Sequence, residues 1–294
     1  MRIAIVTTSW PSSEHDPAGH FVRAEARELE REGHEVSIVA PRAGGGFGWP
    51  GVGARLRARP WRAVEVARWV SSARERVAAL EVDRVVAHWA VPCAWPVGVA
   101  ARSPDLEVIS HGADVRLIVS MPQSIRLRVT RAVAARARVW RFVSAALRDS
   151  LLGALDATTR ESVERVALVR AARIDLPDVR RAAAAKRRDL GVGPIAVSVG
   201  RLVAGKRFER AIDYLARSAE ARVLVVVGDG PERRRLERLA RTRGVDARFV
   251  GLVGRDEALA WIGAGDVLLH ASEAEGLSTV VREAEALGTP VKVV

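Results

Sequence analysis

Two glutamates near the end of the sequence, Glu275 and Glu283, suggest chemistry by their type and spacing. They lie eight positions apart, and the segment between them holds a glycine turn followed by Ser278 or Thr279 as the cap of a helix. The apolar run before them, residues 266–271, predicts a buried parallel strand. A strand, a glycine turn and a helix start direct backbone N–H groups at a bound anion. Beside such a site, the two carboxylates are expected to accept hydrogen bonds from sugar or ribose hydroxyls.

Two cations lie in a glycine-bounded loop after another predicted strand, residues 195–200. Arg201 and Lys206 are five positions apart, in a chain that has three lysines. An arginine grips phosphate with its planar fork and a lysine adds a compact charge, so the pair is expected to bind phosphate. The alternative is two solvated surface cations. A further turn, which holds Gly228 and Gly230, ends the next strand and would lie near a bound nucleotide.

Two histidines end predicted strands in the first half of the chain. His111 follows an apolar strand and precedes a glycine and Asp114, a setting in which side chains enter a ligand cleft. His88 and Trp89 end the neighbouring strand and could line the acceptor side, with the indole as a stacking surface. Core packing is the open alternative for all of these side chains.

The elements that position these residues are two consecutive series of strands and helices, joined near residue 180. The pattern predicts an α/β chain of two facing Rossmann-like domains with parallel sheets, residues 1–178 and 179–294. Residues 41–60 are expected to form a loop, and the apolar residues 87–101 include a predicted helix. Residues 116–138 predict one basic amphipathic helix, which could lie on an anionic bilayer or simply expose a solvated arginine face.

The composition excludes several classes of protein. The chain has 294 residues and a net charge of +12, but nearly all of its basic residues are arginines, which indicates a coding bias more than a nucleic-acid partner. A single cysteine, Cys93, excludes an intramolecular disulfide framework and fits a reducing cytoplasm. No signal peptide or membrane-spanning helix is expected. Neither a Walker A loop nor Gly-x-Gly-x-x-Gly occurs, so neither ATP hydrolysis nor dinucleotide binding is indicated.

Taken together, these motifs resemble the retaining GT-B glycosyltransferases of the family-4 type. The resemblance covers nearly the whole chain in the same order. It rests on the following segments: Gly19, Gly33-His34-Glu35-Val36, His88-Trp89, His111-Gly112-Ala113-Asp114, Gly200-Arg201…Lys206, Gly228-Asp229-Gly230-Pro231, Phe249-Val250-Gly251 and Glu275-Gly276-Leu277-Ser278…Glu283-Ala284…Gly288-Thr289-Pro290-Val291.

The resemblance implies a role for each matching residue. Glu275 would contact the donor sugar and Glu283 the ribose of the nucleotide, while Arg201 and Lys206 would neutralise the donor diphosphate. His111 would lie against the donor sugar and would be catalytic together with Glu275. The other expected donor-binding residues are Gly19, Gly228, Gly230, Leu252, Gly276, Leu277 and Ser278, and the expected acceptor-side residues are His88, Trp89 and Asp114.

The resemblance also implies a function. The enzyme would move a sugar from a UDP- or GDP-type nucleotide-diphosphate sugar to a glycan or lipid-linked acceptor, with retention of configuration and without a metal or other cofactor. A cytoplasmic location is expected, with a peripheral contact to the inner membrane face as one option. Another enzyme of the same fold, such as a sugar-nucleotide epimerase, explains the spacing of Glu275 and Glu283 less well.

The family's second domain normally continues past the position of Val294. The resemblance therefore implies a C-terminally short chain, and Lys292 stands in the last predicted strand, where an apolar residue is expected. The alternative function is a truncated, non-catalytic relic that binds nucleotide sugars. A second copy of the chain could cover the open edge of the sheet.

Overall fold

The computed structural model describes residues 1–294 except 12–18, 43, 49–50, 103–104, 172–173, 175, 192, 219–222 and 273–277. The described residues form two compact units, which we call unit 1 (up to Ala171) and unit 2 (from Ile174 onward). Each is built on its own parallel sheet, so the expected α/β class with two parallel sheets is confirmed. The assignment of the two expected domains to acceptor and donor stays a prediction.

Unit 1 is organised around a parallel sheet that has six strands among the described residues, in the order β2-β1-β3-β4-β5-β6. Its central strands are apolar and β-branched because helices cover both of their faces. In β1, for example, the four residues from Ile3 to Val6 are all fully buried. The strands are β1 (Arg2–Val6), β2 (Glu35–Val39), β3 (Arg84–His88), β4 (Asp105–Ser110), β5 (Ala137–Phe142) and β6 (Ala167–Val169).

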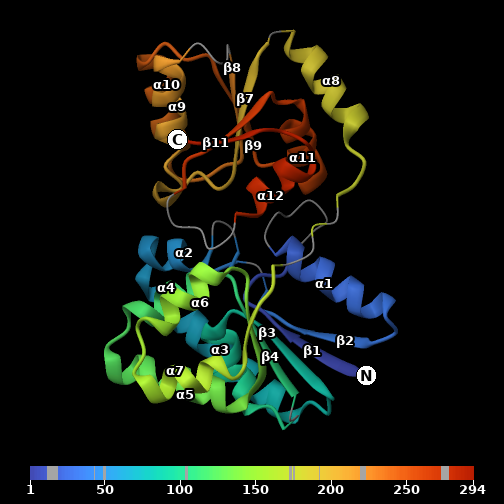
Figure 1. Ribbon diagram of the computed structural model, residues 1–294, viewed down its shortest axis with the longest axis vertical. Helices are drawn as coiled ribbons and strands as arrows, with labels where there is room; N and C mark the ends of the chain where they lie inside the picture. Colours follow the sequence, from blue (N-terminus) through green and yellow to red (C-terminus); the bar gives the residue numbers. More distant parts are fainter. Residues whose placement is uncertain are drawn as a thin grey trace. The chain divides into compact units, whose positions relative to one another are not determined.

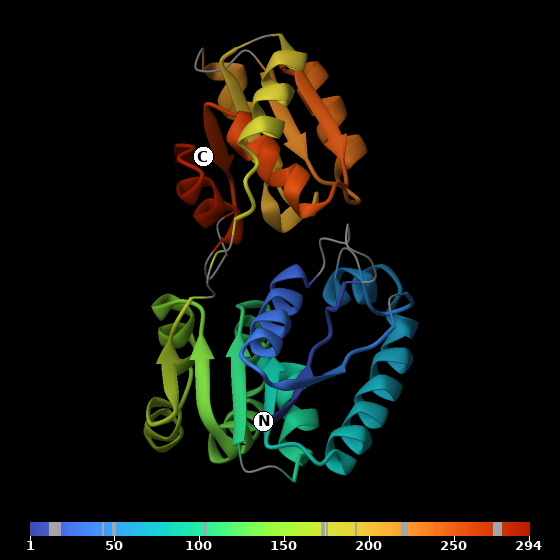
Figure 2. The same ribbon diagram turned by 90° about the vertical axis from the view of Figure 1, so that its right-hand side faces the viewer.

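The helices of unit 1 divide between the two faces of this sheet. Figure 1 shows α1 on one face and α3, α5 and α7 on the other. In Figure 2 the green arrows of the sheet point the same way, so their carboxyl ends meet at one edge. The helices are α1 (His20–Arg31), α2 (Val52–Ala58), α3 (Ala63–Ala79), α4 (Ala113–Ser120), α5 (Gln123–Arg136), α6 (Ala145–Leu152) and α7 (Ala157–Glu164).

Prolines account for two differences from the expected elements. The single helix expected over residues 116–138 is two helices, α4 and α5, because Met121 precedes Pro122 and adopts an extended conformation with ψ 153°. The segment Ala90–Val97 is an irregular helical turn instead of a regular helix. Val91 and Trp95, which each precede a proline, are extended there for the same reason.

The expected loop over residues 41–60 is wrong in part, because α2 lies within it. Its last turn leads through the short turn Pro60–Arg62 into α3. The glycines before Val52 and the arginines after it concealed this short helix, which has seven residues and little apolar periodicity.

Unit 2 has a parallel sheet of five strands among the described residues, in the order β11-β10-β7-β8-β9. Figure 1 shows α9 and α10 on one face and α8, α11 and α12 on the other. Its strands are β7 (Ile195–Val199), β8 (Val223–Val227), β9 (Ala247–Gly251), β10 (Val267–His270) and β11 (Val291–Val293). Its helices are α8 (Arg180–Leu190), α9 (Phe208–Arg217), α10 (Arg233–Thr242), α11 (Arg255–Ala264) and α12 (Thr279–Ala286), with a short turn at Ala204–Lys206.

The lysine in the last strand has a partner that explains it. Lys292 donates a hydrogen bond to the hydroxyl of Tyr214 on α9, and its ammonium lies 4.7 Å from the centre of the tyrosine ring. Its stem can therefore run along the sheet while its charge meets an aromatic group. Within the described parts of both units, no helix is long and apolar enough to cross a membrane.

Candidate functional site

In unit 2, the loops that follow β7, β8 and β9 are joined by backbone hydrogen bonds. Gly200 N–H donates to Val227 at 2.9 Å, and Leu202 N–H donates to Asp229 at 2.9 Å. Gly228 N–H in turn donates to Gly251 at 2.8 Å. The loops at the carboxyl edge of this sheet therefore form one connected layer, which carries Arg201, Lys206, Gly228 and Gly230 among the residues expected to bind the donor.

Two glycines make this layer possible. A Cβ atom on Gly228 would lie 1.9 Å from the carbonyl oxygen of Gly200, and one on Gly230 would lie 2.4 Å from that of Leu202. Both glycines also have positive φ, at 130° and 157°. No other residue type fits such an approach without moving the neighbouring backbone, so the positions of these glycines are explained by the packing of the loops.

The two expected phosphate-binding cations follow β7 on this layer. Arg201 is exposed, and Lys206 is half-buried at the end of the turn Ala204–Lys206. Burial, and then the charge of Lys206, lowers the pKa of His270 at the end of β10. Since β10 pairs with β7, the loops after both strands lie at the same edge of the sheet.

The glutamate on α12 is held by an arginine that the sequence analysis did not identify. Arg255, the first residue of α11, places Nε at 3.1 Å and Nη2 at 3.0 Å from Oε1 of Glu283. The side chain of Glu283 is 8% exposed and that of Arg255 is 28% exposed. Both contacts use Oε1, so Oε2 is left for other donors as far as the described residues are concerned. No sequence signal connects two charged residues on different helices 28 positions apart.

The remaining donor-side predictions have different outcomes. Ser278 is the N-cap residue of α12, as expected, although its side chain makes no capping hydrogen bond. Leu252 follows β9 and is half exposed. Glu275, Gly276 and Leu277 lie outside the described residues. The roles expected for all of these residues stay predictions.

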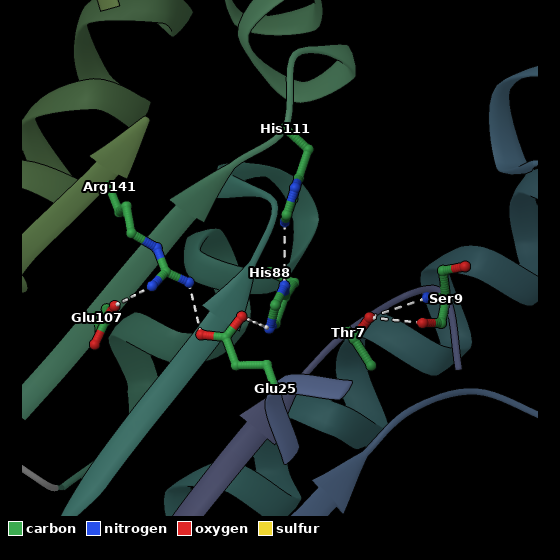
Figure 3. A network of polar contacts seen from close by, with 7 residues as sticks. All are labelled: Thr7, Ser9, Glu25, His88, Glu107, His111 and Arg141. Atoms are coloured by element: carbon green, nitrogen blue, oxygen red, sulfur yellow. Dashed lines mark hydrogen bonds and ion pairs between the residues drawn. The ribbon is translucent and has the colours of Figure 1, made fainter. Parts of the chain in front are cut away.

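In unit 1, the structure brings His88 and His111 together at the carboxyl edge of the sheet. His88 ends β3, and His111 follows β4. Nδ1 of His88 lies 3.1 Å from Nε2 of His111 (Figure 3). Burial, and then the charge of Arg141, lowers the pKa of His88 to about 3. Burial and the neighbouring His88 likewise lower the pKa of His111 to about 3, so both rings are neutral at pH 7.

Behind the histidines lies a charged group that the sequence analysis missed. Glu25 on α1 accepts a hydrogen bond from Arg141 on β5 at 2.6 Å, and its other oxygen lies 3.7 Å from Nε2 of His88. Arg141 also lies 3.7 Å from Glu107. Figure 3 shows these three side chains on one side of His88 and His111 on the other. The spacing of Phe21 and Glu25 on one helix face is the one signal that could have placed Glu25 near the sheet.

Asp114 ties the two histidine loops together. Its carboxylate accepts hydrogen bonds from the N–H groups of Ala90 at 2.8 Å, His111 at 3.2 Å and Gly112 at 3.0 Å. The side chain is almost fully buried. These contacts make Asp114 a structural support of the site, and its expected acceptor-side role stays a prediction.

Aromatic rings surround His111. The ring centroids of Phe21 and Trp89 lie 4.8 Å and 5.1 Å from that of His111. Trp89 is half-buried and has a positive φ of 75°, a conformation that non-glycine residues rarely adopt and that often marks a functional site. Gly19, with φ 74°, begins α1, and a Cβ atom there would lie 2.1 Å from the carbonyl oxygen of Ser9. The loop after β1 therefore requires glycine at that position.

The described residues contain no group of three or more His, Cys, Asp or Glu side chains that could hold a metal ion. The charged residues of both candidate sites are instead paired with one another or carried on exposed loops. The described part of unit 2 offers cations and a carboxylate near helix starts, which suit anionic and hydroxylated ligands.

Comparison with known proteins agrees with this chemistry. Residues 182–293 match the family model Glycosyl transferases group 1. A lipopolysaccharide core biosynthesis glycosyltransferase of Rhizobium meliloti, LpsE, is 37% identical over 98 residues, which are 33% of this chain and 28% of that protein. The sulfoquinovosyl transferase SQD2 of Arabidopsis thaliana is also 37% identical over 98 residues, 33% of this chain and 19% of that protein. The matches thus span less than a third of either relative.

Solved structures match over a much longer part of the chain. Anabaena HepE in complex with UDP has a TM-score of 0.69 and 21% identity, over 99% of this chain and 80% of that one. A sucrose-phosphate synthase from Thermosynechococcus elongatus has a TM-score of 0.69 and 20% identity, over 100% of this chain and 81% of that one. At this identity the likeness establishes the fold, which is that of GT-B glycosyltransferase structures. The chain thus has the GT-B fold of these structures, and its residues 182–293 match the family model Glycosyl transferases group 1.

Proposed function

We propose that the chain transfers a sugar from a nucleotide-diphosphate sugar to a glycan or lipid-linked acceptor, with retention of configuration. The observation that carries the proposal is the connected loop layer of unit 2, which holds Arg201 and Lys206 at the carboxyl edge of the sheet, with Glu283 on the helix after β10. Ligands of open α/β sheets bind at this edge. The match of the same residues to a glycosyltransferase family supports the assignment.

Within this proposal, the two units contribute different groups. Arg201 and Lys206 neutralise the diphosphate, and Oε2 of Glu283 accepts a ribose hydroxyl. Glu275 and His111 contact the donor sugar, and Gly19, Leu252, Gly276, Leu277 and Ser278 complete the donor site. Trp89 faces the acceptor. Charge that develops on the leaving diphosphate is stabilised by cations and helix starts and requires no metal ion.

The identity of the donor base is left to experiment, because the relatives differ. One structural neighbour was solved with UDP, and a mycobacterial relative is named as a GDP-mannose-dependent mannosyltransferase. Incubation with a panel of UDP- and GDP-sugars, with release of free nucleotide as the readout, tests the proposal. The absence of both binding and turnover with every donor would refute the proposal. Binding without turnover would favour the non-catalytic alternative, which no present observation supports. The anomeric coupling constant of the product, measured by NMR, tests retention.

A pair of lysine variants sharpens this test. Lys206→Ala should weaken binding of the nucleoside diphosphate roughly 10- to 100-fold, the scale of one lost hydrogen bond to a charged group. Lys186→Ala also removes one lysine charge from unit 2, but this lysine pairs with Glu257 at 2.8 Å and has no proposed role. Equal effects of both substitutions would show that general charge, and not the proposed site, attracts the nucleotide.

The proposal also includes a contact with a membrane surface and a contact with a second copy of the chain. The exposed Leu117 and Ile125, with Arg116 and Arg128, give α4 and α5 an apolar and basic surface that suits the cytoplasmic face of an anionic membrane. Sedimentation with anionic and with zwitterionic vesicles tests this contact. Among the described strands of unit 2, β11 lies at one end of the sheet and could pair with a second copy, which light scattering tests.

A further inference from the structure

The contact between the two histidines has the geometry of a direct hydrogen bond within one plane. Their ring planes are 8° apart and their centroids are 5.3 Å apart, while the two facing nitrogens are 3.1 Å apart. The centroid distance exceeds the nitrogen distance by about the radius of both rings together. This is the largest excess that the rings allow, so both nitrogens lie close to the line between the centroids. The rings therefore meet edge to edge, and the proton between them lies on either Nδ1 of His88 or Nε2 of His111.

The surroundings of His88 decide between these two positions. Its Nε2 is buried and has no hydrogen-bond partner among the described residues, and the nearest charge is the carboxylate of Glu25 at 3.7 Å. A lone pair on Nε2 would face this negative charge, whereas an N–H there would be attracted to it. The carboxylate thus favours the His88 tautomer that carries its proton on Nε2.

The rest of the charged cluster keeps Glu25 in place. Arg141 donates to the second oxygen of Glu25 at 2.6 Å, and Glu107 on β4 faces Arg141 from the opposite side. Both oxygens of Asp114 on α4 accept hydrogen bonds from backbone N–H groups, and neither is hydrogen-bonded to a ring nitrogen of the described histidines. Since His88 is fully buried and the pKa values of both histidines are lowered to about 3, neither ring gains a second proton near neutral pH.

A proton on Nε2 of His88 leaves its Nδ1 as an acceptor, so Nε2 of His111 must donate to it. The neutral His111 then has a bare lone pair on Nδ1. No described residue makes a hydrogen bond to Nδ1 of His111. His111 is half-buried, and its Nδ1 is not among the fully buried polar atoms that have no partner, so a ligand can reach this nitrogen. The chain Glu25–His88–His111 therefore ends in a hydrogen-bond acceptor at the carboxyl edge of the sheet.

We infer that Glu25 and His88 are positioning residues that hold His111 in the Nε2–H tautomer, so that its Nδ1 accepts a hydrogen bond from a ligand hydroxyl. The inference deepens the proposed function, because it rests on His111 facing a sugar. A bare Nδ1 can only accept a hydrogen bond, so it favours a ligand hydroxyl, which can donate one, over a carbonyl, phosphate or ether oxygen in the same place.

Nitrogen-15 NMR of histidine-labelled protein tests the inference without a turnover assay. Correlations between the ring carbons' protons and both ring nitrogens distinguish the protonated nitrogen from the bare one. The chain has six histidines, and His88→Asn and His111→Asn variants assign the two signals. We expect a protonated Nε2 and a bare Nδ1 in both rings at pH 7. A protonated Nδ1 on His111 in the unmodified protein would overturn the inference.

Two matched substitutions separate the effect of Glu25 from that of general charge. In Glu25→Gln the amide can donate to Nε2 of His88, which favours the opposite tautomer, so the His111 signals should move toward Nδ1–H. Glu107→Gln removes the same charge from the other side of Arg141 without approaching His88, and it should leave both tautomers unchanged. No change in Glu25→Gln, or an equal change in both variants, would overturn the inference.

The consequence for the donor is measured in the same variants. In Glu25→Gln, kcat/KM for the nucleotide sugar should fall about tenfold, the scale of one hydrogen bond, while affinity for the free nucleoside diphosphate stays within about twofold. Unchanged kcat/KM with a switched tautomer would refute the role of His111 as acceptor. Inactivity of the unmodified chain with every donor would refute the proposed function and leave the tautomer result standing.

Discussion

The ion pair between Arg255 and Glu283 offers a direct test of how unit 2 supports its candidate site. We consider Arg255→Gln, which removes the guanidinium that makes two contacts of 3.1 Å and 3.0 Å to one oxygen of Glu283. Loss of one partner of a fully buried pair costs about 3–5 kcal/mol. Because the arginine side chain is 28% exposed and water can reach the vacated space, we expect about 2–3 kcal/mol here.

A double-mutant cycle isolates the pair from the other effects of each substitution. Arg255→Gln, Glu283→Gln and the double variant should show a coupling energy of about 1.5–3 kcal/mol, because the second substitution adds little once the first has broken the pair. Hydrogen exchange followed by mass spectrometry gives local opening free energies from peptides of α11 and α12, separately from unit 1. This separation is needed because a chain of two units need not unfold in one step.

An exposed ion pair in the same unit provides the control. Arg243 contacts Asp213 at 2.9 Å, with side chains that are 53% and 35% exposed, so Arg243→Gln should cost less than about 1 kcal/mol. If the coupling energy of the Arg255–Glu283 pair is below about 0.5 kcal/mol, or if Arg255→Gln costs no more than Arg243→Gln, the carboxylate does not depend on Arg255. The reasoning about the orientation of Glu283 would then be refuted.

The remaining predictions concern the loops and the buried polar groups. Gly230→Ala should destabilise unit 2 by about 2–3 kcal/mol in hydrogen exchange, because its Cβ would clash with the carbonyl of Leu202, whereas Gly205→Ala has nothing within 4 Å and should be neutral. Asp114→Ala should destabilise unit 1 by about 3 kcal/mol and Asp114→Asn by less, since the amide retains one acceptor for the backbone N–H groups; equal costs in urea unfolding would contradict this. The pKa of His88 is about 6.5 in the unfolded state and about 3 in the folded state, so between these values the unfolded state binds a proton that the folded state does not. The free energy of unfolding should therefore fall as the pH drops from about 6.5 toward 3. One pH unit of this proton binding corresponds to about 1.4 kcal/mol. The free energy of urea unfolding should therefore differ between pH 7 and pH 5 by about 2 kcal/mol less in His88→Asn than in the unmodified protein.

The strands were predictable because their burial is written in the sequence. Parallel strands covered on both faces are rich in apolar residues, and the observed β7 and β10 lie within one residue of the expected 195–200 and 266–271. The helices that cover them were predictable where the apolar period was clear. The breaks at Pro122 and before Pro92 and Pro96 required the rule for the residue that precedes proline, which hydrophobic periodicity alone does not contain.

The supporting contacts of the site could not be predicted in the same way. Glu25 meets His88 only because β1 and β3 are neighbours in the sheet, an adjacency that no local pattern specifies. Arg255 meets Glu283 because α11 and α12 pack against each other, a contact that no local pattern specifies either. Sequence motifs name the residues that end strands, whereas their charge partners come from elements distant along the chain.

The connected loop layer of unit 2 has a consequence for how the specificity of such a site can change. The loops after β7, β8 and β9 hold one another through main-chain groups and two glycines, so their conformations depend little on the exposed side chains they carry. Substitutions at exposed positions such as Ala204 can therefore accumulate without loss of the scaffold. Directed evolution of ligand preference should find tolerant positions on these loops, beside a few glycines that admit no replacement.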